Sequence, residues 1–308
     1  MKLFIAGAES KQVRICNGIA NSPSMLLSYY HLAGKQHRIP ADFKSEYHSF
    51  KKGNTSFIMD SGLFTMMFGA GSNQTYEVKE LEEYTERYLA NVKEMQYSDY
   101  IVEMDVHKLF GLKELAKFRK RFTNNYPIDK TIFVWHIEEE IDGWQQMCRT
   151  YPYVAISVPE LRIVLERKFL KGFIQKMIAE AHKINPQIKI HLLGCTSHTL
   201  LSQPGYYSAD STSWLQAVKY GTLKVPHIKG GGIHFDEIAS LESDTINKRV
   251  KANTKILKTK YNLEYIESQV SKVSAISIAA YKLMATELNQ EYFNQSYEGI
   301  DEELTDLL

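Results

Sequence analysis

The 308-residue sequence contains only three cysteines, Cys16, Cys148 and Cys195, and no two of them form a CxxC or CxC pair. This spacing supports neither a disulfide framework nor a cysteine-rich zinc site. Few, widely separated cysteines are typical of proteins from reducing compartments. The cysteine pattern therefore predicts a cytoplasmic location.

Long apolar runs and a strong charge excess are also missing. No stretch of about 18 apolar residues occurs, which argues against a membrane span. The first seven residues hold a short apolar run without the longer apolar region of a secretory signal, so we expect a first strand there. The formal net charge is +1, so a nucleic acid would have to bind through a local basic patch.

No internal repeat and no Pro/Gly/Ser-rich linker divides the chain, which predicts one domain over residues 1–308. Short apolar segments alternate with helical ones, as in parallel βαβ units. We expect strands at 2–6, 56–59, 100–104, 131–135, 153–156, 189–193, 206–209 and 223–226. Helices are expected at 78–95, 112–122, 143–149, 163–184 and 213–220.

About eight such units predict an α/β fold, a (β/α)8 TIM barrel over about residues 1–232. Beyond it the pattern predicts additional C-terminal helices over about 233–308. This extension comprises helices at 236–261 and 264–293 and an acidic tail at 297–308.

In this fold the active site lies at the C-terminal ends of the strands. The residues that follow the expected strands are Asp60, Asp105, His136, Ser157, Gly194 and Asp210. Any one aspartate could simply cap the next helix, and the histidine could be a hydrogen-bonded packing residue. Three carboxylates at equivalent strand ends, however, repel one another unless a substrate, proton or metal uses them. Two carboxylates beside a glycosidic carbon can serve as nucleophile and acid/base.

These segments, in this order, resemble the tRNA-guanine transglycosylase superfamily, which includes relatives that insert 7-deazaguanines into DNA. The similar segments are FIMDSGLFT at 57–65, VEMD at 102–105, FVWH at 133–136, YVAISVPE at 153–160, HLLG at 191–194 and SADSTSW at 208–214. The resemblance covers roughly residues 2–221.

The resemblance implies a role for each strand end. It makes Asp210 the nucleophile and Asp60 the general acid/base, with Asp105 reading the edge of the base. It implies that the base is also bound by Ser61, Gly62, His136, Ser157 and Gly194. His136 stands where the family has a base-reading Gln. Neither a cofactor nor a bound metal is implied.

Family members that act on tRNA carry a CxCxxC-plus-His zinc subdomain after the nucleophile, and the segment 229–234 has no cysteine. The resemblance is therefore closest to the DNA-modifying relatives. It implies a pentosyltransferase that exchanges guanine in DNA for a free 7-deazaguanine through a covalent Asp–sugar intermediate, in the host cytoplasm if phage-encoded. Phosphate contacts are expected from Arg162, Arg167, Lys168 and Gly231, whereas the basic run 117–121 is typical of a solvated helix face.

Three other interpretations stay open on the sequence alone. One is tRNA (queuine-type) base exchange without the zinc module. A second is a metal-dependent TIM-barrel hydrolase with ligands drawn from Asp105, His107, His136 and His191. The third is a catalytically silent barrel that binds nucleic acid.

Overall fold

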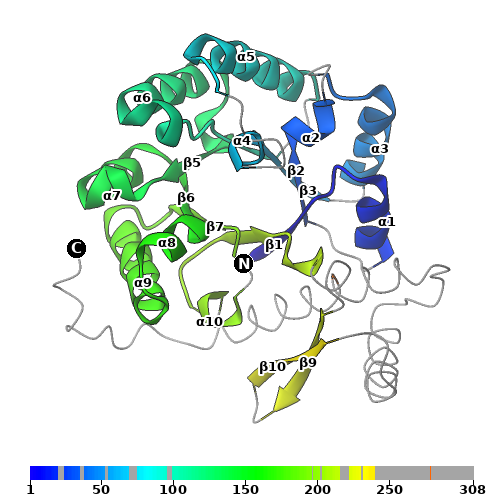
Figure 1. Cartoon of the computed structure of the whole chain (residues 1–308), viewed down its shortest axis with the longest axis vertical. Helices are drawn as coiled ribbons and strands as arrows, with labels where there is room; N and C mark the ends of the chain where they lie inside the picture. The colour runs from blue at the N-terminus through cyan, green and yellow to red at the C-terminus, as the bar shows by residue number, and fades with distance from the viewer. Residues whose placement is uncertain are drawn as a thin grey trace.

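The computed structural model describes residues 1–19, 24–34, 38–52, 55–68, 75–95, 99–195, 197–201, 203–215, 222–229, 232–239 and 278. Eight parallel strands close into a barrel in chain order (Figure 1). They are β1 (Lys2–Ala6), β2 (Ser24–Ser28), β3 (Ser56–Asp60), β4 (Tyr100–Val102), β5 (Thr131–Trp135), β6 (Tyr153–Ser157), β7 (Lys189–Leu193) and β8 (Ser208–Ser211). The expected (β/α)8 fold is confirmed.

Helices follow the strands along the chain, and the longer of these helices form an outer ring around the barrel (Figure 1). The helices are α1 (Lys11–Ile19), α2 (Tyr29–Ala33), α3 (Ala41–Lys52), α4 (Leu63–Phe68), α5 (Val78–Met95), α6 (His107–Asn125), α7 (Glu140–Thr150), α8 (Val158–Val164), α9 (Arg167–Ile184) and α10 (His198–Leu201). Short 3-10 turns occupy Ile128–Lys130, Ile137–Glu139 and Ser213–Leu215. The single helix expected at 163–184 is thus two helices, α8 and α9.

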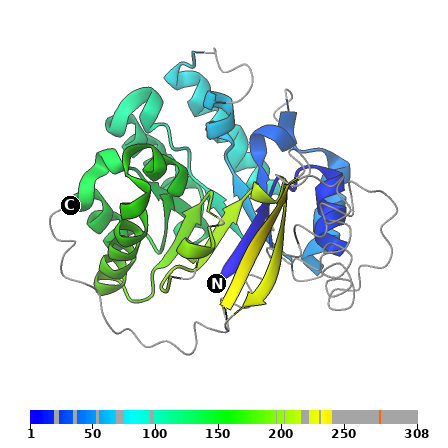
Figure 2. The same ribbon diagram turned by 60° about the horizontal axis from the view of Figure 1, so that its bottom comes forward.

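The strand expected at 223–226 is present, but its expected place as the eighth strand of the barrel was wrong. The barrel contains β2, which was not expected, because its segment SMLLS has only three apolar residues, none of them β-branched, between two serines. Thr222–Lys229 instead forms β9, which pairs antiparallel with β10 (Gly232–Ala239) outside the barrel (Figures 1 and 2). The closed barrel therefore ends at β8 rather than near residue 232.

The helix expected at 236–261 was wrong for its first residues, since Asp236–Ala239 belong to β10. The glycines at 230–232, followed by alternating apolar and polar residues, are a hairpin signal that the helix prediction overlooked. The rest of the expected C-terminal extension lies outside the described residues, apart from Ile278, which is helical and buried.

Two apolar layers hold the barrel together. One fills its interior with residues that alternate along the strands, because successive strand side chains point to opposite faces. It contains Phe4, Ala6, Leu26, Ile58, Val102, Ile132, Val134, Tyr153 and Ala155. The other lies between strands and helices, where α5 buries Leu81, Tyr84, Tyr88 and Val92 at helical spacing.

A buried ion-pair network joins α6 to the barrel. Arg119 bonds Glu103, which follows β4, and Glu139, and it also donates to the carbonyl of Val134 on β5. Burial alone would lower the pKa of Arg119, but the adjacent carboxylates outweigh it and raise that pKa. The guanidinium therefore stays charged inside the protein.

Within the described part of the chain, no helix combines the length and the apolar character that a membrane crossing needs.

Candidate active site at the barrel mouth

The carboxyl ends of the strands bring the three predicted aspartates into one electrostatic neighbourhood. Asp60 ends β3, Asp105 follows β4, and Asp210 lies in β8. Ile58 faces the barrel interior, and alternation along the strand turns Asp60 to the same side. Asp60 and Asp105 are half-buried, and Asp210 is buried.

The carboxyl of Asp60 takes up a proton near neutral pH. Burial raises the pKa of Asp60 to about 7, and the negative charge of Asp105 acts in the same direction. A hydrogen bond of 3.0 Å from the backbone N–H of Gly62 opposes the rise, whereas the charges of Asp210 and Glu9 add to it. Asp60 is thus set up as a proton donor and acceptor around pH 7.

Asp210 is held in one orientation by two hydrogen bonds to the same oxygen. Its Oδ1 accepts from the backbone N–H of Gly194 at 3.0 Å and contacts His191 Nε2 at 3.1 Å. Gly194 has φ +61, and a Cβ there would lie 2.6 Å from Pro159 Cγ, so only glycine brings its N–H to this place. No described residue bonds Oδ2 of Asp210, which leaves that oxygen for a substrate.

A chain of polar side chains runs from Asp210 into the barrel. His191 Nδ1 contacts Ser208 Oγ at 2.5 Å, and Ser208 Oγ contacts Tyr153 Oη at 2.5 Å. His191 and Ser208 are fully buried, so each polar atom requires such a partner. His191 therefore supports Asp210 and does not join His107 and His136, contrary to the ligand set of the hydrolase interpretation.

Asp105 lies between the aspartates and a histidine cluster. Burial raises the pKa of Asp105, while the positive charge that His136 and His107 can carry opposes the rise. The backbone N–H of Asp105 donates a hydrogen bond to its own carboxylate, and no other described residue donates to that side chain. Its carboxylate is therefore open to a donor on a ligand.

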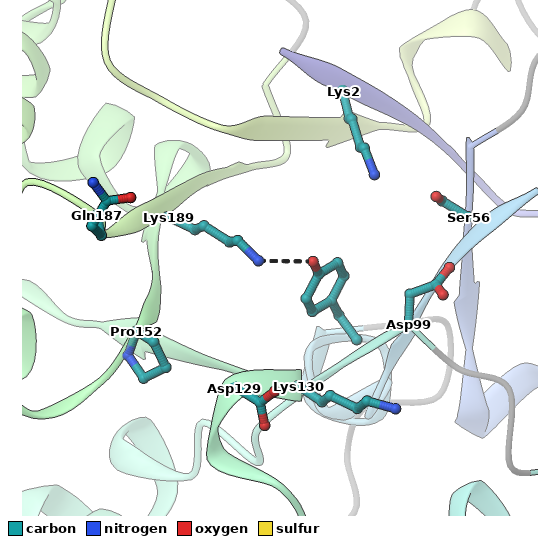
Figure 3. Close-up of a pocket in the computed structure, with 9 residues that line it drawn as sticks. Lys2, Ser56, Asp99, Asp129, Lys130, Pro152, Gln187 and Lys189 are labelled. Atoms are coloured by element: carbon teal, nitrogen blue, oxygen red, sulfur yellow. Dashed lines mark hydrogen bonds between the residues drawn. The ribbon is translucent and has the colours of Figure 1, made fainter.

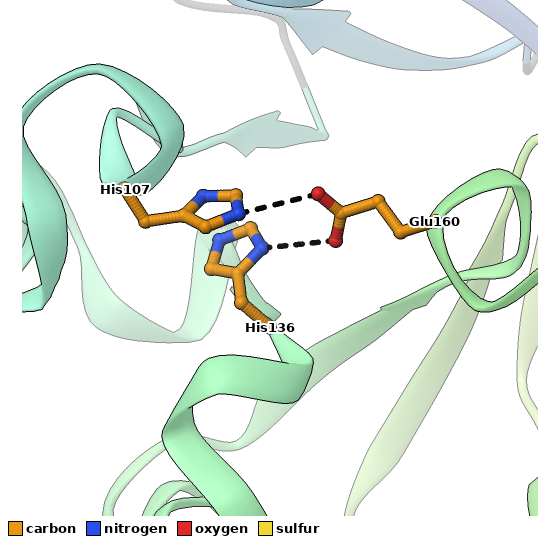
Figure 4. Close-up of side chains that lie close together, drawn as sticks. All are labelled: His107, His136 and Glu160. Atoms are coloured by element: carbon orange, nitrogen blue, oxygen red, sulfur yellow. Dashed lines mark hydrogen bonds and ion pairs between the residues drawn. The ribbon is translucent and has the colours of Figure 1, made fainter. Parts of the chain in front are cut away.

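His136 stacks on His107, with ring centroids 3.4 Å apart, and Glu160 of α8 faces both rings (Figure 4). His136 Nδ1 lies 3.2 Å from Glu160 Oε2, and His107 Nε2 lies 3.2 Å from Glu160 Oε1. Burial would raise the pKa of Glu160, but the contacts with His107 and His136 outweigh it and lower that pKa. Both rings are buried.

The remaining predicted base-binding residues shape the backbone of the mouth. Ser61 is buried and its Oγ accepts from the N–H of Leu63, which starts α4. Gly62 has φ +80, and a Cβ there would lie 2.4 Å from Tyr30 Cβ. Ser157 ends β6 directly before α8. These positions fix the turns that carry the functional side chains.

The predicted phosphate-binding residues are only partly located. Arg162 on α8 and Arg167 and Lys168 on α9 are exposed, and Lys168 forms an ion pair with Glu166 at 2.9 Å. They lie on the helices that follow β6, as expected. Gly231 lies outside the described residues.

Two acidic residues of this neighbourhood were not predicted. Glu9 lies three residues after β1 and accepts a hydrogen bond from the backbone N–H of Ser28 at 3.3 Å. The rule that singled out Asp60 missed Glu9, because Glu9 lies three residues beyond the end of β1 rather than directly after it. Glu160 was hidden because it lies on α8 rather than at a strand end.

A cavity of about 350 Å³ opens at the opposite end of the barrel (Figure 3). It is lined by Lys2, Ser56, Asp99, Tyr100, Asp129, Lys130, Pro152, Gln187 and Lys189, which lie at the starts of strands or just before them. Lys189 Nζ donates to Tyr100 Oη at 3.0 Å. The N-terminal end of such barrels serves stability rather than catalysis, so this cavity is not the candidate active site.

Comparisons with known proteins do not assign the chain to a family. No protein-family model matches the chain, and a search of curated proteins finds no match. What can be said of function therefore depends on the residues and their geometry.

Proposed function

We propose that this chain is a transglycosylase that exchanges guanine in DNA for a free 7-deazaguanine base. One observation is the main support for this proposal. Asp60, with a pKa of about 7, shares the mouth of the barrel with Asp210, whose Oδ1 is held by two donors and whose Oδ2 is open. Carboxylates in two such different environments suit an acid/base and a nucleophile.

In the first half of the reaction, an oxygen of Asp210 attacks the anomeric carbon of the nucleotide. The bond from that carbon to the guanine nitrogen breaks, and the proton of Asp60 passes to the leaving base. This step leaves a sugar–Asp210 ester and an ionised Asp60. The target nucleotide has to leave the base stack first, at a cost of a few kcal/mol in a duplex.

The second half reverses these events with a different base. A 7-deazaguanine attacks the anomeric carbon, the ester bond to Asp210 breaks, and Asp60 accepts the proton of the incoming base. Among the described residues, the Asp105 carboxylate accepts only from its own backbone N–H, so it can also accept from the ring N–H and exocyclic amine of a guanine-like edge. The backbone N–H of Gly194 holds Asp210 through both halves.

The test is an exchange assay with labelled guanine and labelled 7-deazaguanine, run with duplex DNA, single-stranded DNA and tRNA. We expect label in DNA with the wild-type protein and a loss of at least about 10³-fold in Asp210→Asn. Asp129→Asn, an exposed aspartate at the opposite end of the barrel, is the matched control and should keep full activity.

Each polymer gives a distinct answer. Label that enters tRNA alone would keep base exchange and overturn the DNA substrate. Label that enters no polymer, or incorporation that survives in Asp210→Asn, would contradict the proposal.

A further inference from the structure

We propose that His107, His136 and Glu160 form a binding site for one divalent transition-metal ion, for which Zn²⁺ is the probe. The three residues come from the ends of neighbouring units of the barrel: His107 begins α6, His136 follows β5, and Glu160 lies on α8 (Figure 4). One possible ligand atom from each lies within 4.8 Å of the other two. This site does not depend on the base-exchange reaction.

The hydrogen bonds of the two rings leave one nitrogen of each available to an ion. His107 Nδ1 contacts the backbone carbonyl of Asp105 at 3.2 Å, and His136 Nδ1 contacts Glu160. If Nδ1 carries the proton in each ring, Nε2 carries a lone pair. A metal-binding histidine has this arrangement, with one nitrogen on the metal and the other N–H on a carbonyl or carboxylate.

Both Nε2 atoms are buried, and neither has a partner with hydrogen-bond geometry within the described residues, although His107 Nε2 has its ion-pair contact with Glu160. His136 is fully buried and His107 is 7% exposed, so water does not readily satisfy them. An unsatisfied buried polar atom costs about 1–3 kcal/mol, and such atoms in a folded protein call for an explanation. An ion held by the cluster would supply a partner of the kind these nitrogens lack.

The distance between His107 Nε2 and Glu160 Oε1 also suits a shared ion. It is 3.2 Å, yet the contact lacks hydrogen-bond geometry. Zinc–nitrogen and zinc–oxygen bonds of about 2.0–2.2 Å at a tetrahedral angle separate two ligand atoms by roughly 3.3–3.5 Å. The rings are now stacked with 21° between their planes, so we expect the planes to open when an ion binds both.

The charges around the cluster favour a cation. The carboxyl group of Asp105 interacts electrostatically with His107, His136 and Glu160. Glu138 Oε2 lies 3.8 Å from His107 Nε2. Lys108 opposes them, since its Nζ pairs with Glu138 and lies 4.0 Å from Glu160 Oε1. Two imidazoles and one carboxylate leave coordination positions open, as in catalytic zinc sites.

The experiment is isothermal titration of the full-length, chelator-stripped protein with ZnCl₂, repeated with CoCl₂ while the visible absorption of Co²⁺ is followed. We expect one ion per chain and a cobalt spectrum typical of nitrogen and oxygen ligands in a tetrahedral field. Glu160→Gln and His136→Ala should each weaken binding by at least about tenfold. His31→Ala, an exposed histidine on α2, is the matched control and should bind as the wild type.

Two further variants keep the outcome unambiguous. His107→Ala repeats the test should Glu160→Gln or His136→Ala fail to fold by circular dichroism. Asp210→Asn should retain the ion, because Asp210 lies across the mouth on β8. No ion bound by the wild-type chain, or unchanged binding in folded variants of His107, His136 and Glu160, would overturn the site.

Discussion

Replacing Asp60 by asparagine should stabilise the protein in alkaline solution. The folded state raises the pKa of Asp60 from 3.8 to about 7. The proton bound to Asp60 therefore stabilises the folded state. This stabilisation has its full size below about pH 3.8 and is lost as the pH rises through about 7. Above pH 7 the folded protein contains an ionised carboxylate that its surroundings disfavour.

The size of the effect follows from the shift. About three pKa units at 1.36 kcal/mol each give a ceiling of about 4 kcal/mol for the cost of ionised Asp60 in the folded state. The side chain is half-buried, and solvent screening reduces this to roughly 2 kcal/mol. The groups whose charges interact with Asp60 are Asp105, Asp210, Glu9 and, on α5, Tyr84 and Tyr88.

Asparagine keeps the acceptor oxygen that faces the N–H of Gly62 and removes the charge. We expect Asp60→Asn to raise the free energy of unfolding by about 2 kcal/mol at pH 8.5 and by less at pH 5. The gain should nearly vanish at pH 3. Urea denaturation at the three pH values measures it, with Asp129→Asn as a control that should stay within about 0.5 kcal/mol of the wild type.

An Asp60→Asn variant that is no more stable than the wild type at pH 8.5 would contradict a raised pKa of Asp60. A gain in stability that does not shrink toward acid pH would contradict it equally. The same variant should lose base exchange, because it cannot pass a proton to the leaving guanine. A substitution that stabilises the fold and removes activity is the expected behaviour of a residue kept for function.

Two other substitutions, measured by urea denaturation, test the backbone turn at Gly62 and the buried ion-pair network of Arg119. Gly62→Ala should cost about 2–4 kcal/mol, because φ +80 strains alanine and its Cβ would lie 2.4 Å from Tyr30 Cβ. Gly34→Ala, also at positive φ but with nothing within 4 Å, should cost clearly less, and equal losses would refute the clash. Arg119→Leu should cost about 3–5 kcal/mol by leaving Glu103 buried without its partner. A loss under 1 kcal/mol would show that the network contributes little.

Much of the fold could be predicted because local pattern and global fold agree. The strand at Thr131–Trp135 and the helix at Val78–Met95 have the expected bounds, since each has one clear period and clear ends. The failures share a cause. Ser24–Ser28 is a strand through its pairing with β1 and β3, and Thr222–Lys229 is a hairpin strand through its pairing with β10. The pairing partners of a strand lie far away in the sequence and cannot be inferred from the short segment itself.

The site was predictable to the extent that it follows strand ends. That rule correctly placed Asp60, Asp105 and Asp210 in one neighbourhood. It gave no information about how their environments differ, because burial and hydrogen bonds come from the assembled barrel. The roles proposed for these aspartates stay predictions until exchange is measured.

The position of the histidine cluster explains why the two proposals can fail separately. Asp60 and Asp210 lie on β3 and β8, whereas His107, His136 and Glu160 follow β4, β5 and β6. A barrel places side chains from all its strands around one mouth, so two neighbouring chemistries fit the same fold. Exchange without zinc binding would leave His136 as a base contact. Zinc binding without exchange would instead favour metal-assisted hydrolysis at this mouth, with Asp105, which lies beside the cluster, as the first residue to substitute.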